Sequence, residues 1–329
     1  MKRLFLIVCL SSSFLVSVVN QGTWVEAADP FPVKPISIII PMEAGASADI
    51  IFRPLMEKAS ALLGKPILVV NKPGAGHTIG YREVYRAKPD GYTIGMASGS
   101  IITAKLQGLL PYDHRDFTHL CTVTYVYPMI VASMKTQRPF KTIEEAFSFA
   151  KSHPGEVSMA TSQLGGPLWN AAMVIQEGTG LQFNIVPQEG SAGLIVIQAA
   201  GGHTDLGIVF PAAAKGQIEA GNIRFLAAAG PERYPGRYNT IPTIKEIGYD
   251  VSYYSFSSII GPPKMPKEIK DKLIKAFETA KRDPEFEKHV LAQNSLPWHL
   301  PPDLFINSCD KERETFRRVL AKAGLLKEK

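Results

Sequence analysis

The sequence is poor in the residues that most catalytic and metal centres need. It has three cysteines and seven histidines among 329 residues, and no two histidines are four positions apart, the spacing that would place both imidazoles on one face of a helix. It also contains no nucleophile elbow, no phosphate-binding loop and no arrangement of paired carboxylates. We therefore expect a protein that is not an enzyme and that holds no metal and no cofactor.

Charge of one sign is not concentrated anywhere in the chain. Lys and Arg number 36 and Asp and Glu 30, a formal net charge of +6, and no basic run interleaved with aromatic residues occurs. This pattern does not support nucleic-acid binding. It offers at most a weak field that attracts anionic solutes.

The apolar stretch near the beginning of the chain has the features of a secretory signal. Two basic residues precede the segment Leu4–Leu10, a serine-rich tract follows, and small residues flank Glu26 at the positions that a signal peptidase reads. We expect a signal peptide over residues 1–27. A membrane anchor is the alternative, but serines interrupt the segment and no later span of about twenty apolar residues follows. Cys9 comes after a bulky valine, which argues against a lipid anchor, so we expect an exported, soluble product.

Two cysteines, Cys121 and Cys309, remain after such a cleavage. In an oxidising compartment they could form a disulfide, but their separation in sequence says nothing about their distance. A disulfide and two free thiols both stay open.

Apolar, β-branched segments alternate with helix-like segments along most of the chain. The predicted strands are 36–40, 67–70, 92–97, 127–132, 157–160, 183–186, 205–210, 225–229 and 256–260. The predicted helices are 48–63, 79–87, 143–151, 167–179, 192–200, 242–247, 267–281, 284–292 and 302–323. This alternation predicts an α/β architecture with parallel sheets covered by helices on both faces.

Two extended segments, 117–133 and 251–261, are rich in Tyr, Ser, Thr and Val and lack helical periodicity. Each is suited to leave one sheet and enter another, which would make them crossings between two domains. The alternative is two ordinary long strands in one large sheet.

Two glycine-bearing loops follow predicted strands, within Pro35–Arg53 and Pro66–Val84. Each loop leads into a helix, so free backbone N–H groups and the positive end of a helix dipole are directed at one place. Because ligands of such sheets lie beyond the carboxyl ends of the strands, the loops predict one site for a carboxylate-sized anion. The alternative is two tight turns that bind nothing.

Three blocks in this region carry a resemblance to a known family. They read PMEAGASADIIFR at Pro41–Arg53, LGKPILVVNKPGAGHTIG at Leu63–Gly80 and PDGYT at Pro89–Thr93. In order and spacing they resemble the periplasmic solute-binding proteins of tripartite tricarboxylate transporters, the Bug receptors. The resemblance continues over nearly the whole chain.

The resemblance implies a type II periplasmic-binding-protein fold, a clamshell of two doubly wound α/β lobes joined by two crossing segments. One lobe would comprise residues 28–126 plus 254–329, and the other residues 127–253. A small carboxylate, whether a di- or tricarboxylate, an aromatic acid or an amino acid, would be held in the cleft largely by backbone amides of the glycine loops. We expect a monomer in the periplasm that delivers this ligand to the large and small membrane subunits of a tripartite transporter. A receptor that presents its ligand to a membrane sensor kinase is one alternative, since both functions need the same clamshell, and an exported α/β enzyme is the other.

In the first lobe the chain departs from the family pattern. Ala46 and His77 stand where the family usually has glycine, and Ala48 replaces a hydroxyl residue. The imidazole of His77 either donates to an anion or only narrows the cleft, and Glu43 either favours a ligand with an amine or hydroxyl donor or is solvated. The contacts implied in this lobe are Met42, Glu43, Ala46, Ser47, Ala75, Gly76, His77, Thr78 and Ser98.

Two polar residues near these loops are expected to support them rather than to contact the ligand. Asp49 lies in the first helical turn after the first loop, where its carboxylate would repel an anion but can accept backbone N–H bonds. Asn71 ends a predicted strand shortly before Pro73, a position typical of a turn former.

The second lobe departs further from the pattern, in TSQLGGPLW at Thr161–Trp169. Gln163, Gly166 and Trp169 replace glycine, serine and histidine there. Trp169 either stacks on a flat ligand or packs in the core, and Asp205 either accepts a hydrogen bond from the ligand or caps a structural element. The contacts implied in this lobe are Thr161, Gly165, Trp169, Gln188, Ser191, Asp205 and Phe210.

Overall fold

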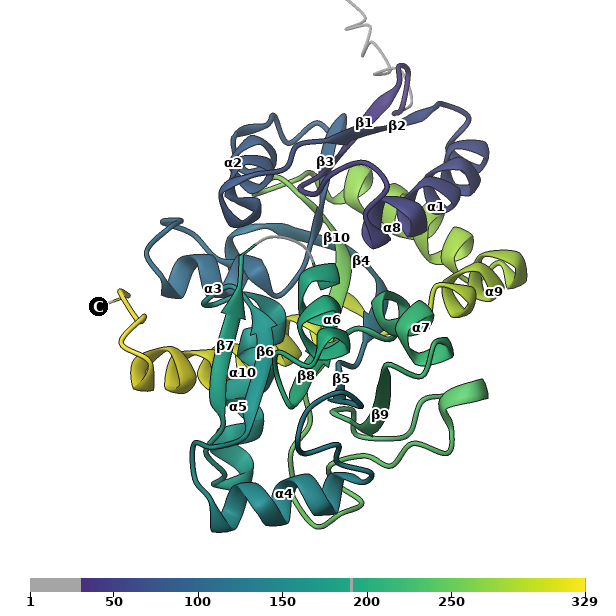
Figure 1. Cartoon of the computed structure of the whole chain (residues 1–329). Coiled ribbons are helices and arrows are strands. Elements are labelled where there is room, and N and C mark those ends of the chain that lie inside the picture. The colour runs from purple at the N-terminus through teal and green to yellow at the C-terminus, as the bar shows by residue number, and fades with distance from the viewer. Residues whose placement is uncertain (1–30, 190–191, 329) are drawn as a thin grey trace, which may run out of the picture. The chain divides into compact units, whose positions relative to one another are not determined.

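The computed structural model describes residues 31–189 and 192–328, so the predicted signal peptide and Ser191 lie outside the described residues. Phe31–Lys329 cluster as one unit. Its described part contains a six-stranded sheet in the order β11-β4-β10-β3-β1-β2 and a five-stranded sheet in the order β7-β6-β8-β5-β9 (Figure 1).

The six-stranded sheet and its helices are built from both ends of the described chain. The N-terminal elements are β1 (Ile36–Ile40), α1 (Ser47–Leu63), β2 (Ile67–Asn71), η1 (Ala75–His77), α2 (Thr78–Arg86), β3 (Thr93–Ala97), α3 (Ser100–Leu106), η2 (His114–Asp116) and β4 (Thr118–Val126). The C-terminal elements are β10 (Ser255–Gly261), α8 (Lys267–Lys281), α9 (Pro284–Ala292), β11 (Leu296–Pro297) and α10 (Pro302–Lys322).

The strand β1 pairs in parallel with the edge strand β2 on one side and with β3 on the other. Because connections between parallel strands are right-handed, α1 and α2 must cover opposite faces of the sheet. The apolar stripe of α1, which includes Phe52 and Leu55, packs with α8 and α9 in one core cluster, whereas Tyr81 and Val84 of α2 belong to the other cluster. The helix α1 ends at Gly64, whose φ of 71° suits a left-handed helix end.

The five-stranded sheet is formed by the middle of the chain. Its elements are β5 (Met129–Ser133), α4 (Ile143–Ser152), β6 (Ser158–Ser162), α5 (Pro167–Thr179), β7 (Asn184–Gln188), α6 (Ala192–Gly201), β8 (Leu206–Val209), α7 (Pro211–Glu219), β9 (Ile223–Ala228) and η3 (Gly236–Tyr238). The strand β6 pairs in parallel with β7 and β8, so α5 and α6 also lie on opposite faces.

The expectation of parallel sheets is wrong, because both sheets are mixed. In the first sheet β10 runs antiparallel to β3 and β4, and in the second β5 runs antiparallel to β8 and β9. Both β5 and β10 are strands that enter their sheet just after the chain has left the other one. The parallel strands of each sheet end near the crossing, whereas β5 and β10 begin there. The two strands therefore run antiparallel to them. Apolar composition carries no information on this direction.

The helix predicted at 242–247 is also wrong, because this segment forms turns. The Glu246 carboxylate accepts the Thr243 N–H at 2.8 Å, and the Thr243 hydroxyl accepts the Glu246 N–H at 3.1 Å. This reciprocal pair of hydrogen bonds is typical of a helix start. The turn does not extend into a helix, because Gly248 has a φ of 98°. Conversely, α3 and α7 were not predicted. In α7 only Pro211 and Ala214 are buried, so the segment has no apolar periodicity.

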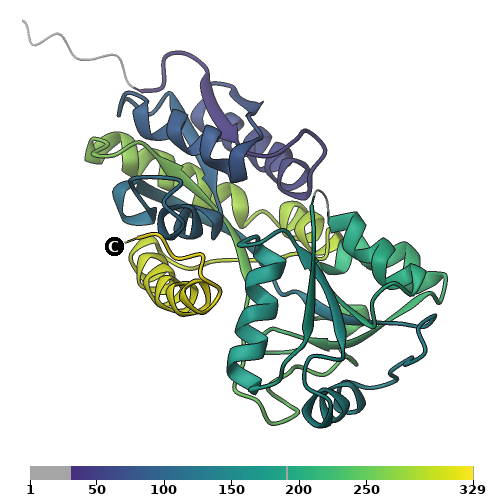
Figure 2. The same cartoon turned by 60° about the vertical axis from the view of Figure 1, so that its left-hand side comes forward.

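The chain passes from one sheet to the other between β4 and β5 and returns just before β10. The predicted lobe limits at residues 126/127 and 253/254 stay predictions. The C-terminal helix α10 packs against both α3 and α5 (Figure 2). Arg318 and Lys322 of α10 lie 3.4 and 3.0 Å from the Glu177 carboxylate of α5.

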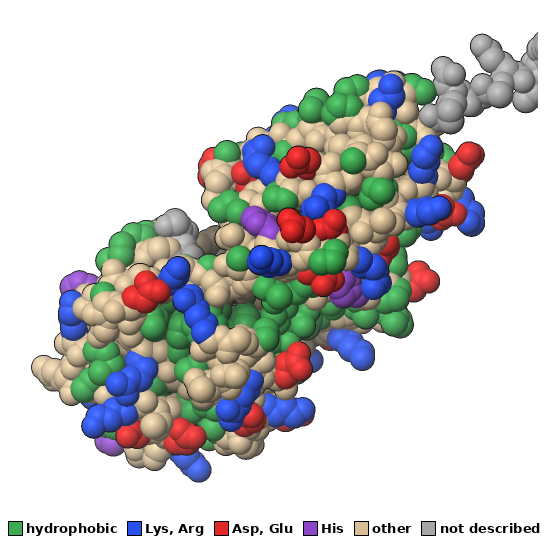
Figure 3. Space-filling view, turned by 90° about the vertical axis from the view of Figure 1, so that its right-hand side faces the viewer, with side chains coloured by type: hydrophobic (Ala, Val, Ile, Leu, Met, Phe, Trp, Pro, Cys, Tyr) green, Lys and Arg blue, Asp and Glu red, His purple; other side chains and the backbone are tan. Residues whose placement is uncertain are grey.

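Cys121 and Cys309 are both buried and free, which settles the question of their pairing. On the face drawn in Figure 3, Lys and Arg are interspersed with Asp and Glu. No helix among the described residues has both the length and the apolar character needed to cross a membrane.

Candidate ligand cavity

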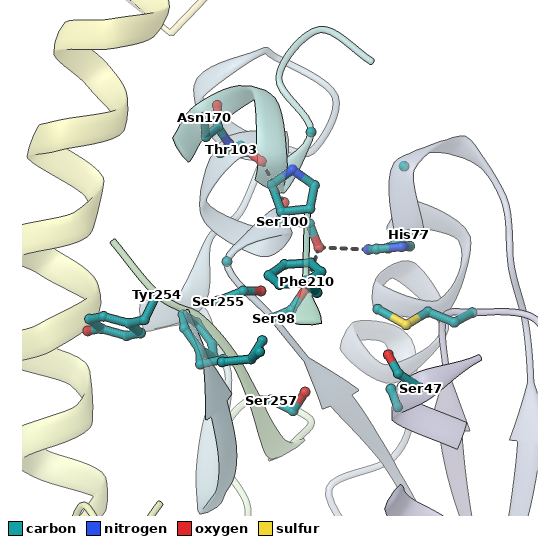
Figure 4. Close-up of a pocket in the computed structure, with 18 of the residues that line it drawn as sticks. Ser47, His77, Ser98, Ser100, Thr103, Asn170, Phe210, Tyr254, Ser255 and Ser257 are labelled. Carbon is teal, nitrogen blue, oxygen red and sulfur yellow. Dashed lines mark hydrogen bonds between the residues drawn. The ribbon is translucent and has the colours of Figure 1, made fainter. Parts of the chain in front are cut away.

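A cavity of about 450 Å³ is lined by residues that follow the carboxyl ends of β1, β3, β6 and β8, and by the first residues of β10 (Figure 4). Residues from both sheets therefore meet there, at the strand ends where the glycine loops were predicted to act. Its polar side chains are Ser47, His77, Ser98, Ser100, Thr103, Gln107, Thr124, Gln163, Asn170, Glu189, Tyr253, Tyr254, Ser255, Ser257, Gln293, Asn294 and Ser295.

The first glycine loop contributes Met42 and Ser47 to the cavity. A carboxylate behind the loop holds its backbone: Asp49 accepts the Gly45 N–H at 2.9 Å. Asn71 donates to Asp49 Oδ1 at 3.0 Å and to the Met42 carbonyl at 3.1 Å. These bonds connect the end of β1, the start of α1 and the end of β2, so the loop has little freedom to move.

Asp49 is 3 % exposed and pairs with Arg53, whose Nε and Nη2 lie 2.9 and 2.8 Å from its two oxygens. Burial opposes ionisation, but hydrogen bonds from Arg53, Gly45 and Asn71 outweigh it and hold the pKa of the Asp49 carboxyl below its usual value. The carboxylate thus stays charged inside the protein and is directed away from the cavity, which it does not line.

The second glycine loop forms the short helix η1, in which Ala75, Gly76 and His77 all have positive φ, at 46°, 61° and 74°. Two of these residues are not glycine, and left-handed backbone costs energy for any residue with a Cβ. The Thr78 hydroxyl donates to the Ala75 carbonyl at 2.9 Å and stabilises this turn. The loop presents Gly76 and His77 to the cavity.

His77 connects to a chain of hydroxyl groups at the end of β3. Its Nδ1 lies 2.8 Å from Ser100 Oγ. Ser100 Oγ lies 2.7 Å from the Tyr81 hydroxyl and 2.8 Å from Ser98 Oγ. Burial lowers the pKa of His77 and raises that of Tyr81. Without a ligand, both groups are therefore biased toward their neutral forms.

The five-stranded sheet brings Gly165 and Phe210 of the predicted residues to the cavity. Gly165 has φ 74°, and a Cβ there would lie 2.1 Å from Gln107 Nε2 of the opposite sheet. At Gly165 the backbone thus approaches the Gln107 side chain too closely to leave room for a side chain of its own.

Other residues predicted for this side are engaged elsewhere. Trp169 is 3 % exposed, packs in the core and donates its backbone N–H to Ser162 Oγ. The Asp205 carboxylate accepts the N–H and hydroxyl of Ser158 at 3.0 and 2.8 Å, at the amino ends of β6 and β8, opposite the cavity. The buried Thr161 hydroxyl donates to the Ser162 carbonyl, and the half-buried Gln188 amide donates to the Val186 carbonyl. Of the first lobe's predicted residues, Glu43, Ala46, Ala75 and Thr78 do not line the cavity.

Several lining residues were missed by sequence reasoning. Ser255 and Ser257 of β10 alternate with buried Phe256, a period-two pattern that places both hydroxyls on one face of the strand. This signal is visible in the sequence, where the segment was interpreted as a crossing or a long strand and its serines were not assigned to the site. Ser100 and Thr103 could not be placed, because α3 was not predicted.

The family model described as the tripartite tricarboxylate transporter family receptor matches residues 51–305. The match covers more than half of the chain. The chain belongs to this receptor family. The resemblance inferred from the three sequence blocks is thereby confirmed.

Individual proteins with similar sequences agree with this family assignment. Protein BugT of Bordetella pertussis is 30 % identical over 226 residues, which are 68 % of this chain and 68 % of that protein. A protein of the gbd 5′ region of Cupriavidus necator is 28 % identical over 306 residues, 91 % of this chain and 90 % of its own.

Solved structures show the same fold. A TctC solute-binding protein from Polaromonas, solved without a ligand, superposes with a TM-score of 0.77 at 25 % identity over 89 % of this chain and 99 % of its own. MatC from Rhodopseudomonas palustris with bound malate gives 0.72 at 22 % identity, over 88 % and 100 % of the two chains. An R. palustris protein with adipate gives 0.75 at 22 %, over 89 % and 98 %. The predicted two-lobed α/β fold of the periplasmic-binding-protein type is confirmed.

Proposed function

We propose that this receptor is exported to the periplasm, binds a small carboxylate in the cavity and delivers it to a tripartite tricarboxylate-type membrane transporter. The observation that carries the proposal is the cavity itself. Both glycine loops open onto it, and hydroxyl and amide donors from both sheets surround it. Its volume of about 450 Å³ is in the usual range of small-molecule sites.

The chemistry of the lining supports an anion that is bound by neutral donors. Hydrogen bonds to a carboxylate are charge-assisted and stronger than bonds between neutral groups. Two proteins with a similar fold hold malate and adipate, both dicarboxylates. Delivery to a transporter rests on the family membership of the chain.

The direct test is a thermal-shift screen of residues 28–329 against malate, adipate, citrate, benzoate and glutamate, followed by calorimetry. A ligand that binds only the folded protein raises the melting temperature, and the stabilisation grows with the logarithm of its concentration over Kd. We expect a rise of several degrees for at least one acid. Failure of all carboxylates to stabilise the protein would contradict the proposal.

Introducing a negative charge into the cavity wall tests where the ligand binds. Ser47 lines the cavity at the first turn of α1. A carboxylate at this position interacts favourably with the helix dipole, so it should not destabilise the fold, but it repels a bound anion. We expect Ser47→Asp to fold normally and to bind the acid at least about tenfold more weakly, since one repulsive contact near a protein surface is worth about 1.4 kcal/mol or more. Ser47→Asn, of the same size but neutral, is the matched control. Equal affinity of both variants would place the ligand elsewhere.

Transport is tested in cells. Deletion of the gene for this chain should abolish uptake of the identified acid, and the wild-type gene should restore it while the Ser47→Asp gene should not. Undiminished uptake in the deletion strain would contradict the delivery step.

A further inference from the structure

His77 occupies an unusual place in the cavity wall. Its ring follows a left-handed backbone at the end of η1 and stands edge-on to the Tyr81 ring, at 6.4 Å between centroids. One ring nitrogen, Nδ1, faces Ser100 at 2.8 Å. Among the described residues the other nitrogen, Nε2, has no hydrogen-bond partner, and the ring lines the cavity (Figure 4).

The hydroxyl groups behind His77 accommodate either charge state of its ring. A hydroxyl both donates and accepts, so Ser100 can donate to Nδ1 of a neutral imidazole. When the ring is protonated, Ser100 can instead accept from Nδ1–H and direct its own hydrogen to the Tyr81 hydroxyl or to Ser98 Oγ, at 2.7 and 2.8 Å. Protonation therefore needs only the rotation of hydroxyl hydrogens, and no polar group loses its partner.

Among the described lining residues, His77 is the one whose side chain can supply positive charge to an anion. No Lys or Arg is among the described residues that line the cavity, and Glu189 is the acidic residue of this lining. Apart from Glu189, the described lining offers a bound carboxylate only dipoles besides His77, so the potential of the anion acts directly on the imidazole. A nearby negative charge favours the protonated ring.

Charged and titratable groups on the elements packed against η1 are engaged away from His77. On α2, Arg82 donates to the Leu109 carbonyl and Glu83 pairs with Lys72, while Arg86 and Tyr85 lie toward Tyr112. On α3, Lys105 donates to the Pro111 carbonyl. Tyr81 contacts the ring and stays neutral, because burial raises its pKa. Tyr253, Tyr254 and Glu189 share the cavity lining.

We propose that His77 takes up a proton when a carboxylate enters the cavity, so that its imidazolium becomes the cationic partner of the ligand and affinity rises as the pH falls. This inference rests on the proposed carboxylate-receptor function. Burial keeps the pKa of His77 below its usual value in the empty protein, and the bound anion raises it. Ligand binding is accompanied by proton uptake at pH values between the pKa of His77 in the empty protein and its pKa in the complex. In this pH window the affinity rises by at most about tenfold for each unit by which the pH falls, the limit for one proton. The ligand carboxylates themselves are ionised above about pH 6.

Proton uptake is measured directly by calorimetry. Malate and adipate, together with any other acid that stabilises the protein, are titrated into residues 28–329 between pH 6 and 8 in phosphate and in imidazole, which both buffer in this range and whose ionisation enthalpies differ. The dependence of the apparent enthalpy on the buffer gives the number of protons bound. We expect a fraction approaching one proton inside the window and a matching rise in affinity toward low pH.

Variants assign the proton to His77. Asn tolerates the left-handed backbone and keeps amide donors without titrating, so His77→Asn should bind with a flat pH profile and no proton uptake. His153→Asn, at an exposed histidine beyond the end of α4, is the matched control and should behave as wild type. If His77→Asn does not bind at all, an NMR titration of the wild-type His77 ring decides, because its pKa must rise in the presence of ligand.

The outcomes separate the two proposals. Binding of a carboxylate without proton uptake, or with an unchanged pKa of the His77 ring, overturns this inference and leaves the receptor function intact. Retention of the pH dependence in His77→Asn overturns it equally. Failure of every carboxylate to bind at any pH overturns both proposals.

Discussion

The two sides of the cavity differ in how directly the sequence places residues in it. On the side of the six-stranded sheet, Met42, Ser47, Gly76, His77 and Ser98 all reach the cavity. They belong to loops that begin within a few residues of a strand end. On the side of the five-stranded sheet, most of the predicted side chains that the structure describes are instead part of the internal structure.

The difference shows which property of a loop can be read from a sequence. A loop that follows a parallel strand must emerge at the carboxyl edge of the sheet, whatever its side chains do. The direction of a side chain within a strand or helix depends instead on what packs around it. Trp169 lies in the first turn of α5, beside the cavity, but its side chain is buried in the core, where a large apolar group gains more by burial.

The largest expected effect tests the assignment of Trp169 to the core. Trp169→Ala should lower the free energy of unfolding by about 3–5 kcal/mol, the usual cost of removing a large buried aromatic side chain. Urea denaturation measures it. Phe210→Ala is the comparison, because Phe210 is half-buried and lines the cavity; it should cost less stability and weaken ligand binding. A Trp169→Ala protein of normal stability that fails to bind would reverse our view of this side of the cavity.

A smaller effect is expected from the support of the first glycine loop. Asp49→Ala leaves the Gly45 N–H without its acceptor and removes one of the two acceptors of the Asn71 amide, and it should cost about 1–3 kcal/mol. Because the folded pKa of Asp49 is lowered, this contribution is present above the unfolded value near 3.8 and is lost as the pH falls through the folded value. The difference between wild type and variant should therefore shrink in acid, as measured by urea denaturation at several pH values.

Glu43→Ala is the control for this loop, since Glu43 is exposed. It should change stability by less than about 0.5 kcal/mol. An equal loss in both variants would mean that the Asp49 bonds do not hold the loop.

A variant of Asp205 tests whether this residue supports the structure or contacts the ligand on the side of the five-stranded sheet. Asp205→Ala removes the acceptor of the Ser158 N–H and hydroxyl and should cost about 1–2 kcal/mol. Because Asp205 lies at the amino end of β8, away from the cavity, calorimetry should find ligand affinity unchanged. A tenfold loss of affinity at normal stability would restore Asp205 as a ligand contact.

The smallest expected effect concerns the approach of the two sides at Gly165. Gly165→Ala should cost about 1 kcal/mol, because alanine is strained at a φ of 74°. The added Cβ also displaces the Gln107 amide, which is the flexible end of a side chain. Adding Gln107→Ala to Gly165→Ala should remove the steric contribution to the destabilisation and leave the contribution of the strained backbone. Thermal unfolding of the single and the double variant would measure the difference. No difference between them would mean that Gln107 moves aside freely.

Much of the fold followed from patterns of short range. Pro167–Thr179, Lys267–Lys281 and Pro284–Ala292 were predicted with the observed limits, because a proline begins or immediately precedes each helix. The mixed strand directions and the helix α3 were not predicted. Strand direction depends on which sheet the chain has just left, and α3 is too short for a clear apolar period.

By itself the sequence determined the α/β class, the two glycine loops, the family and the chemical class expected for the ligand, because these depend on local patterns and on motif order. Only the tertiary structure decided that Trp169 and Asp205 serve the interior and that Ser255 and Ser257 join the cavity wall. It alone placed His77 beside Ser100 and Tyr81, with no Lys or Arg among the described lining residues. The physical reason is that the environment of a charge is set by neighbours that are distant in sequence, whereas a turn or a helix start is set by residues next to it.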